Sequence, residues 1–588
     1  MVKEDSVPVA AESPPADRAE PAASRSDEDP AAGRSMAGAP AAPRSRALDR
    51  VIIGASAVAI TFFAAQILMF GYGRDQGIYA MVADAVLRGQ MPYRDAWDFK
   101  PPGIFVVFAA ARALFGPAQV GIRVLEVAGL LGMCAALVKL ADRFWQNRAA
   151  GFLAAALTLL THAQLDFWHT AQPESFGGMV TVFALLLAAR TDHEPAPGAR
   201  RMFLAGVLFG VAGLLKPPLA GGGAVLALYL AHRTWRASAA LPPRGRLRSA
   251  SIPFLWIALG GAAPIAATAL WFLAKGALRD LHAVLFVFTP YYTKLGWEGS
   301  SVGGMFYWSF IEWLTTYCSA MSIGVLLALG YGAESKHRPF LALLLGIIAV
   351  HLLGVTMQGK FFPYHYGATW PLTALVAAYG YDRLRRRLEA RGQLGMLAFG
   401  AIVIASCLGR SATKDTPDSF MSRCRKRITL LAGGFHDQTT RDGLMSIADV
   451  NAASNRRAAE ILRERVPPGR PVFVWGFEPV IYDLAERPSA SRFLYNVPQR
   501  VTWSKADMRK TLLEDLAKTP PAAVVVEHHD VFPMVTGDTI DSADTLFDFW
   551  DFFVFLQKYE LIEKAGDLDI YLEKPPTEGA SPPEKPTN

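Results

Sequence analysis

Long apolar blocks separated by short basic segments limit most strongly what this chain can fold into. From Val51 onward the apolar residues come in blocks of about 15 to 22, flanked by Arg and Lys. Blocks of this length match helices that cross a hydrocarbon core of about 30 Å. Only 19% of the 588 residues are charged and 52% are hydrophobic, which is unusual for a soluble protein of this size. The sequence therefore predicts a polytopic α-helical membrane protein.

The basic residues orient the chain in the membrane and do not indicate nucleic-acid binding. The net charge is +7, but the arginines gather in short loops between apolar blocks, where positive charge marks the cytoplasmic side. The cysteines lack the spacing of a metal site, and three of the four fall within apolar blocks; they are Cys134, Cys318, Cys407 and Cys424. Neither a disulfide framework nor a cysteine metal site is predicted.

The chain divides into three parts. Residues 1–46 are rich in Ala, Pro, Ser, Asp and Glu without apolar periodicity, which predicts a disordered cytoplasmic tail. Residues 47–410 form the predicted transmembrane domain, whose first span, 51–70, follows three arginines and leaves the external loop 71–118 outside. Residues 411–588 form an external connector and domain.

The apolar block 104–115 decides the count of crossings. With about 12 residues it is short for a span and suits a helix lying in the membrane interface. If it does not cross, the later basic loops all fall on the cytoplasmic side. About eleven spans result; those after the first lie near 120–141, 149–165, 174–190, 202–215, 217–231, 252–273, 313–331, 339–354, 366–381 and 393–409.

The same count places one set of loops on the external face of the inner membrane. They are 71–118, 166–174, 216–218, 274–312, 358–367 and the whole chain after residue 410. In that last region, after a polar connector to about residue 450, the helical segments "NRRAAEILRERV" and "RKTLLEDLAK" alternate with the strands "PVFVWG" and "AAVVVE". An aromatic helix and two short strands, "YELIEK" and "LDIYLEK", follow. This alternation predicts a compact α/β domain that gives support or binds an acceptor.

Ionisable residues gather at the external ends of the predicted spans. Burying such groups near the hydrocarbon without a partner costs several kcal/mol, so they indicate an aqueous cavity or a bound ion. In such a cavity a carboxylate can take a proton from a hydroxyl, and cations can hold an anionic leaving group such as phosphate. The candidates are Arg74, Asp75, Lys100, His169, Glu174, Lys216, Lys360, Tyr364 and His365.

Four passages occur in an order that is typical of one enzyme superfamily. "RDQGIY" with Asp75 follows the first span, and "GQMPYRDAWDFKPP" runs from Gly89 to Pro102. "AQPE" opens a later span at Glu174, and "FFPYHY" (361–366) precedes one of the last spans. Over about residues 50–410 the chain resembles the GT-C membrane glycosyltransferases, especially the bacterial relatives of protein O-mannosyltransferases and of the lipid A aminoarabinose transferase.

The resemblance implies a sugar transfer at the outer face of the cytoplasmic membrane. The donor would be a polyprenyl-phosphate sugar, the acceptor a hydroxyl of a lipid, glycan or protein, and the anomeric carbon would be inverted. Asp75 matches the acid of the first external loop and would be the general base. Lys100 matches the lysine that contacts the carrier phosphate in the aminoarabinose transferase group. Lys216, Lys360 and His365 are further candidates for holding that phosphate.

Two positions depart from the family pattern. Phe99 precedes Lys100, where the aminoarabinose transferase group has an acidic residue, so the question of a divalent metal is left open and no site is assigned. Gln76 follows Asp75, where the protein O-mannosyltransferases have an Asp-Glu pair, which favours the bacterial relatives. Arg74 would keep the Asp75 carboxylate ionised.

Each candidate also has a purely structural explanation. Asp75 can cap the helix that follows it. Lys100 can extend its ammonium to the interface, and Glu174 suits the first turn of a helix. His169 and His365 can belong to an aromatic belt at the membrane surface.

Two other protein classes stay open. A transporter or flippase for a glycolipid or polyprenyl carrier also has many spans and segments broken by Gly and Pro, such as "GLLKPPLAGGG". Such a protein needs a site near the middle of the membrane, whereas the polar groups here gather on one face. The third class is a membrane scaffold whose external domain binds a partner.

Overall fold

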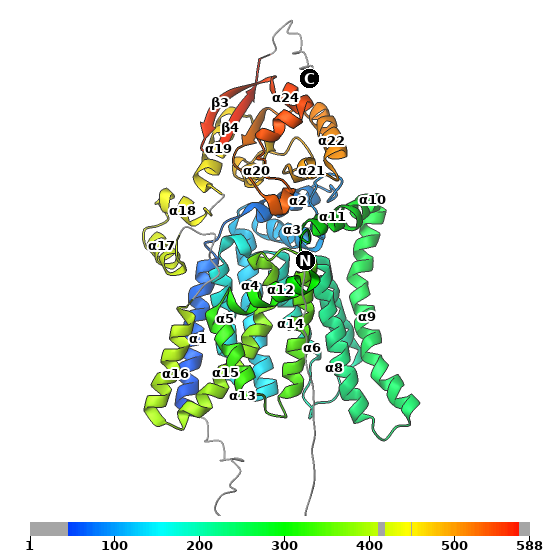
Figure 1. Ribbon diagram of the computed structural model, residues 1–588, viewed down its shortest axis with the longest axis vertical. Coiled ribbons are helices and arrows are strands. Elements are labelled where there is room, and N and C mark those ends of the chain that lie inside the picture. The colour runs from blue at the N-terminus through cyan, green and yellow to red at the C-terminus, as the bar shows by residue number, and fades with distance from the viewer. Residues whose placement is uncertain (1–44, 410–417, 448–449, 576–588) are drawn as a thin grey trace, which may run out of the picture. The chain divides into compact units, whose positions relative to one another are not determined.

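The computed structural model describes residues 45–409, 418–447 and 450–575, so nearly all of the predicted tail lies outside the described residues. Long helices fill residues 46–407 and pack against one another, for example α5 against α1, α4 and α15, and α7 against α6 and α9 (Figure 1). Their bounds are α1 Arg46–Ile67, α2 Arg74–Leu87, α3 Gly103–Phe115, α4 Val120–Trp145, α5 Arg148–Leu165, α6 Pro173–Ala188, α7 Ala199–Leu215, α8 Gly221–Ala237, α9 Pro243–Ala274, α10 Leu278–His282, α11 Thr289–Leu295, α12 Val302–Thr315, α13 Ser319–Tyr331, α14 Arg338–Gln358, α15 Trp370–Glu389 and α16 Gly392–Cys407.

Helices suit this region because a helix pairs its own backbone groups where water is excluded. In the described part of the chain α1, α4, α9 and α14 are each long and apolar enough to cross a membrane, and α3, α6, α13 and α16 are shorter apolar helices. The count of about eleven spans therefore stays a prediction.

The apolar blocks coincide with helices at nearly every predicted position, with two differences. The predicted span 313–331 is divided into α12 and α13 by a break at residues 316–318. The predicted loop 274–312 contains α10, a π-helical turn at Ala283–Phe288, α11 and most of α12. The predicted span did not include the apolar and aromatic residues before position 313, which form most of α12.

The first external loop is folded by two helices, α2 and α3. The apolar block 104–115 is helical as predicted, and α3 begins directly after the Pro101-Pro102 pair. Gly103 lets the start of α3 approach the end of α7, because a Cβ at this position would come within 2.7 Å of the Leu214 backbone. This contact fixes the segment that carries Lys100.

The C-terminal region contains a four-stranded mixed sheet in the order β1-β2-β4-β3, with β1 (Val472–Trp475) parallel to β2 (Ala523–Glu527). The hairpin of β3 (Tyr559–Ala565) and β4 (Leu568–Glu573) adds to β2 antiparallel, which confirms all four predicted strands. β1 and β2 are buried along their whole length, and both consist mainly of apolar residues. The helices here are α19 Ala452–Arg465, α20 Val480–Ala485, α21 Val497–Arg500, α22 Lys505–Lys518, α23 Pro533–Thr536 and α24 Trp550–Leu556.

The segment predicted as a polar connector contains two helices, α17 (Phe420–Ala432) and α18 (Gln438–Leu444). α17 places Arg423 and Arg427 on one face, one turn apart, and both pair with the fully buried Asp166 at 2.6 Å. Asp166 in turn caps the turn Phe167–His169 through the Phe167 N–H. The sequence analysis predicted only a polar connector here and did not identify these two helices.

Candidate active site

Asp75 projects from the first turn of α2. The start of this helix is capped by its neighbour Gln76, whose Oε1 accepts from the Gly73 N–H at 2.9 Å while its Nε2 donates to the Thr170 carbonyl at 2.6 Å. Gln76 therefore does the capping that the sequence analysis considered for Asp75. The Asp75 carboxylate is left at the helix N-terminus, where the helix dipole favours negative charge.

Lys100 meets Asp75 from the loop before α3. Its Nζ lies 3.3 Å from Asp75 Oδ2, with the two side chains 11% and 21% exposed. Three aromatic rings surround the ammonium, with centroids 5.4 to 5.7 Å away: Tyr79, Phe99 and Tyr364. Burial by itself would lower the pKa of Lys100, but nearby carboxylates, Asp75 first among them, outweigh it and raise this pKa. Lys100 is therefore a permanent cation beside the carboxylate.

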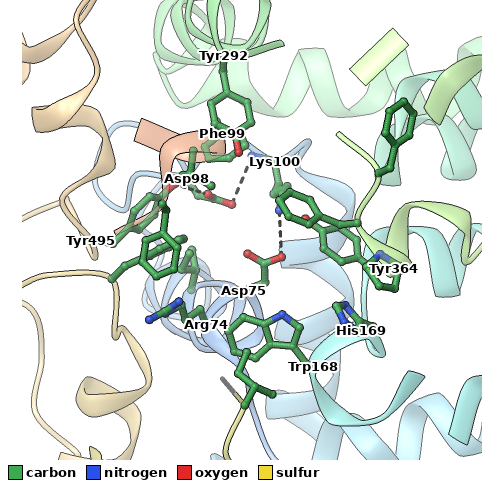
Figure 2. A pocket seen from close by; sticks show the side chains of 18 of the residues that line it. Arg74, Asp75, Asp98, Phe99, Lys100, Trp168, His169, Tyr292, Tyr364 and Tyr495 are labelled. Carbon is green, nitrogen blue, oxygen red and sulfur yellow. Dashed lines mark hydrogen bonds and ion pairs between the residues drawn. The ribbon is translucent and has the colours of Figure 1, made fainter. Parts of the chain in front are cut away.

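Asp75 and Lys100 lie on the wall of a cavity of about 400 Å³ (Figure 2). Much of the wall is aromatic, with Phe99, Trp168, Tyr292, Tyr317, Phe361, Phe362 and Tyr364. The remaining polar groups of the membrane region include Asp98, His169 and Glu312. The C-terminal region contributes Ile447, Phe477, Tyr495, Phe532 and Val535. The cavity thus combines a carboxylate and a cation with aromatic faces of the kind on which sugar rings stack.

Arg74 has a different role from the predicted one. Its guanidinium points away from the Asp75 carboxylate in Figure 2. It pairs with Glu478 at 2.9 Å and with Glu527 at 3.3 Å, two buried carboxylates of the C-terminal domain. Arg74 is therefore a link between α2 and the C-terminal domain.

Lys216 and Glu174 form a buried ion pair with each other. Neither belongs to the wall of the cavity. Burial lowers the pKa of Lys216, and the attraction of Glu174 opposes this change. Because Glu174 already balances its charge, Lys216 is less suited to hold a phosphate than the sequence analysis expected.

Lys360 is a second lysine close to the cavity. Its side chain is buried, its Nζ lies 3.0 Å from the centroid of the cavity residue Tyr292, and this Nζ has no hydrogen-bond partner in the described part of the chain. Burial lowers the pKa of Lys360 to about 6, with a further contribution from repulsion by Lys100. A proton gained by this buried amine calls for an anion beside it.

The histidines support the aromatic wall. His365 Nδ1 bonds with the Lys360 carbonyl at 2.6 Å, and its ring lies edge-on to Tyr364 at 4.5 Å. Burial, the largest cause, and Lys216 hold the pKa of His365 well below its usual range, so the ring is neutral and a poor phosphate ligand. His169 stacks on Tyr364 at 6.0 Å and lines the cavity.

Several cavity residues were not identified from the sequence. Trp168 and Tyr292 lie in segments predicted to be external, but single aromatic residues there carry no distinguishing signal. Glu312 lies just before a predicted span. Phe477 and Tyr495 are about 400 positions away from Asp75 along the chain, so no local pattern connects them with the first loop.

The structure assigns no metal site. Among the described residues, no group of three or more His, Cys, Asp or Glu side chains is placed to hold a metal ion. Phe99 stands directly before Lys100, and Asp98 is the nearest acidic residue on that side of Lys100. Its carboxylate accepts from the Tyr495 hydroxyl at 2.8 Å and from the Lys100 N–H at 3.4 Å.

Comparisons with known proteins identify the fold. No protein-family model and no curated protein sequence matches the chain. The chain is similar to the crystal structure of ArnT from Cupriavidus metallidurans in the apo state, with 16% identity, a TM-score of 0.51, and 90% of this chain and 98% of that chain covered. The same protein bound to undecaprenyl phosphate matches with 15% identity, a TM-score of 0.51 and the same coverage.

A third similar structure is the archaeal oligosaccharyltransferase AglB from Archaeoglobus fulgidus, in complex with an inhibitory peptide and a dolichol-phosphate. It has 12% identity and a TM-score of 0.42, with 82% of this chain and 70% of that chain covered. The ArnT matches extend over nearly the whole chain and show that it shares the fold of those structures, which confirms the predicted order of a helical region followed by a small C-terminal sheet domain.

Proposed function

We propose that the protein is an inner-membrane glycosyltransferase that moves a sugar from a polyprenyl-phosphate donor to an acceptor hydroxyl on the external face. The observation that carries the proposal is the pairing of Asp75 with Lys100 at 3.3 Å on the wall of an aromatic cavity. The ArnT structure with bound undecaprenyl phosphate has the same fold and supports a donor of this class. The sugar, and whether the acceptor is a lipid, a glycan or a protein, are open.

The proposed reaction is a single displacement with inversion. The acceptor oxygen attacks the anomeric carbon, its proton passes to Asp75, and the bond from that carbon to the phosphate oxygen breaks. The leaving phosphate takes the electron pair, and Lys100 and Lys360 stabilise its new charge. Phosphate is a good leaving group, so fixed positive charge suffices on that side of the reaction.

The residues around the cavity also favour a transferase over a transporter. They come from 71–118, 166–174, 274–312, 358–367 and the C-terminal region, all predicted to be external, and from Thr316 and Tyr317 at the start of a predicted span. A transporter needs a site that opens to both faces. A cavity built from one face suits an enzyme that draws donor and acceptor from the membrane and the external space.

The proposal is tested with the full chain in lipid nanodiscs and a panel of undecaprenyl-phosphate monosaccharides, with total membrane lipid as acceptor. We expect one undecaprenyl phosphate to be released for each sugar transferred, measured by mass spectrometry of both products. Movement of the intact donor across proteoliposomes, with no release of undecaprenyl phosphate, would identify a flippase. Glycan and lipid analysis of a deletion strain identifies the acceptor in the cell.

Donor binding should weaken as the pH rises above 6. In the free protein Lys360 is an ammonium below its pKa of about 6 and neutral above it. A bound phosphodiester stays singly charged near neutral pH and favours the ammonium, so binding above pH 6 takes up a proton. The Kd for the donor should therefore rise by up to about tenfold per pH unit above about pH 6. Calorimetric titrations in buffers of different ionisation enthalpy measure both the Kd and the proton uptake.

The matched variant is Lys360→Met, which should bind more weakly below pH 6 and lose both the pH dependence and the proton uptake. Equal wild-type affinity on both sides of pH 6 would remove Lys360 from the phosphate site.

A further inference from the structure

The residue directly before Asp75 is held by the C-terminal domain. Arg74 Nε and Nη2 reach Glu478 Oε1 at 2.9 Å and Glu527 Oε1 at 3.3 Å, and all three side chains are buried. The aromatic rings of Phe477 and Phe532 lie 5.2 and 4.3 Å from the guanidinium carbon. A buried pair of this kind tolerates little displacement, because breaking it leaves a charge without a partner in a site with little water.

The segment before Lys100 is held by the same domain at a second point. The Tyr495 hydroxyl donates to Asp98 Oδ1 at 2.8 Å, and Asp98 Oδ2 accepts from the Lys100 N–H at 3.4 Å. One residue earlier, the Trp97 N–H donates to the Arg492 carbonyl at 2.8 Å. Tyr495 therefore fixes the Asp98 carboxylate, and this carboxylate accepts a hydrogen bond from the Lys100 backbone.

The two carboxylates of the first anchor come from the same end of the sheet. Glu527 is the last residue of β2, and Glu478 follows the end of the parallel strand β1, so both lie at the carboxyl ends of neighbouring strands. Glu478 Oε2 is fixed by Asn455 Nδ2 at 2.6 Å. The Phe477 ring packs on the Tyr495 ring at 5.1 Å, which ties the first anchor to the second.

We propose that Glu478 and Tyr495 are positioning residues, which act through Arg74 and Asp98 to set the separation of Asp75 and Lys100. The inference rests on the proposed function and deepens it. Asp75 and Lys100 belong to different segments, the start of α2 and the loop before α3, and the domain binds each segment separately. The C-terminal domain is therefore required for the chemical step as well as for any contact with the acceptor.

The size of the effect follows from the sensitivity of transfer reactions to geometry. A displacement of about 1 Å between reacting groups can cost about 100-fold in rate. Removing one hydroxyl or one charge should produce part of this loss. A domain that only bound the acceptor would change the acceptor KM, and one that only stabilised the fold would change the melting temperature.

The test uses the full chain in nanodiscs with the most active undecaprenyl-phosphate sugar of the panel. Tyr495→Phe removes only the hydroxyl and keeps the ring contact with Phe477, and Glu478→Gln removes one charge without a change of size. Each should lower kcat by about tenfold or more while the acceptor KM stays within about twofold. The matched controls are Tyr571→Phe and the partly exposed Glu563→Gln of the same domain, which should keep the wild-type kcat.

A double-variant cycle separates a positioning effect from a general loss of fold stability. Asp98→Ala with Tyr495→Phe should be no slower than the slower single variant, because both changes break the hydrogen bond between Tyr495 and Asp98. The melting temperature of Tyr495→Phe should stay close to that of the wild type. If Glu478→Gln does not fold, Tyr495→Phe carries the test.

The inference is overturned if Tyr495→Phe turns over at the wild-type kcat, or if its only change is a higher acceptor KM, while Asp75→Asn is inactive. That result would leave the proposed function intact. If wild type and Asp75→Asn give equal product, or neither gives any, the proposed function itself fails.

Discussion

Asp75→Asn is expected to lower kcat for sugar transfer by about 1,000-fold, since an amide cannot accept the proton of the attacking hydroxyl. The change keeps the size of the side chain, and the hydrogen bond from Gln172 at 3.2 Å can still reach the amide oxygen. The start of α2 is capped by Gln76, so the helix does not depend on Asp75. Loss of rate with an unchanged fold is therefore the expected result, measured as product formed per protein molecule.

The control for this variant is Asp192→Asn, an exposed aspartate in a loop predicted to be cytoplasmic that pairs with Arg233. It should keep full activity. Donor affinity of Asp75→Asn should not fall, because the change removes a negative charge from the neighbourhood of the phosphate. An Asp75→Asn protein that turns over at the wild-type rate would rule out Asp75 as the base.

Lys100→Gln is expected to lower kcat by about 100-fold or more and to raise the donor KM, because the cation stabilises charge that grows on the phosphate during the reaction. Lys100 pairs with Asp75 at 3.3 Å, so the phosphate of a bound donor replaces or shares this ion pair. Lys100→Arg should recover part of the activity, since it restores the charge with different geometry. Steady-state rates at varied donor concentration separate the two constants.

Lys275→Gln is the matched control for this variant, because Lys275 is an exposed lysine that follows α9. Its rate and donor KM should equal those of the wild type. Lys100→Gln with both constants unchanged would mean that Lys100 only supports the fold of the loop. In that case Lys360, the other buried lysine near the cavity, becomes the main phosphate ligand.

The local patterns of the sequence predicted most of the elements. Apolar blocks predicted helices, the short block 104–115 predicted α3, and runs of Val predicted β1 and β2. These predictions succeed because the period and the length of an apolar run depend on which residues of the segment are buried. The connector was not predicted as helical, since α17 is stabilised by the ion pairs of Arg423 and Arg427 with Asp166, which lies about 260 residues earlier.

The candidate site was predicted in part. Asp75 and Lys100 were identified as candidates because each lies a few residues from an apolar block and matches a position of the family that the sequence resembles, and they come together in one cavity. Arg74 and Lys216 were expected to act in the site, but their charges are taken up by Glu478 and Glu527 and by Glu174, respectively. Which carboxylate a cation meets depends on the packing of distant segments, and this choice leaves no trace in the local sequence.

The sequence alone determined the membrane class of the protein, the order of its elements and the segments in which reactive side chains gather, because these follow from block length, charge and periodicity. Only the tertiary structure decided which of those side chains share a cavity. It also showed that the C-terminal domain forms part of the cavity wall and holds Arg74 and Asp98, through contacts between residues about 400 positions apart. Side-chain geometry across such separations is set by packing and ion pairing, which only the folded chain defines.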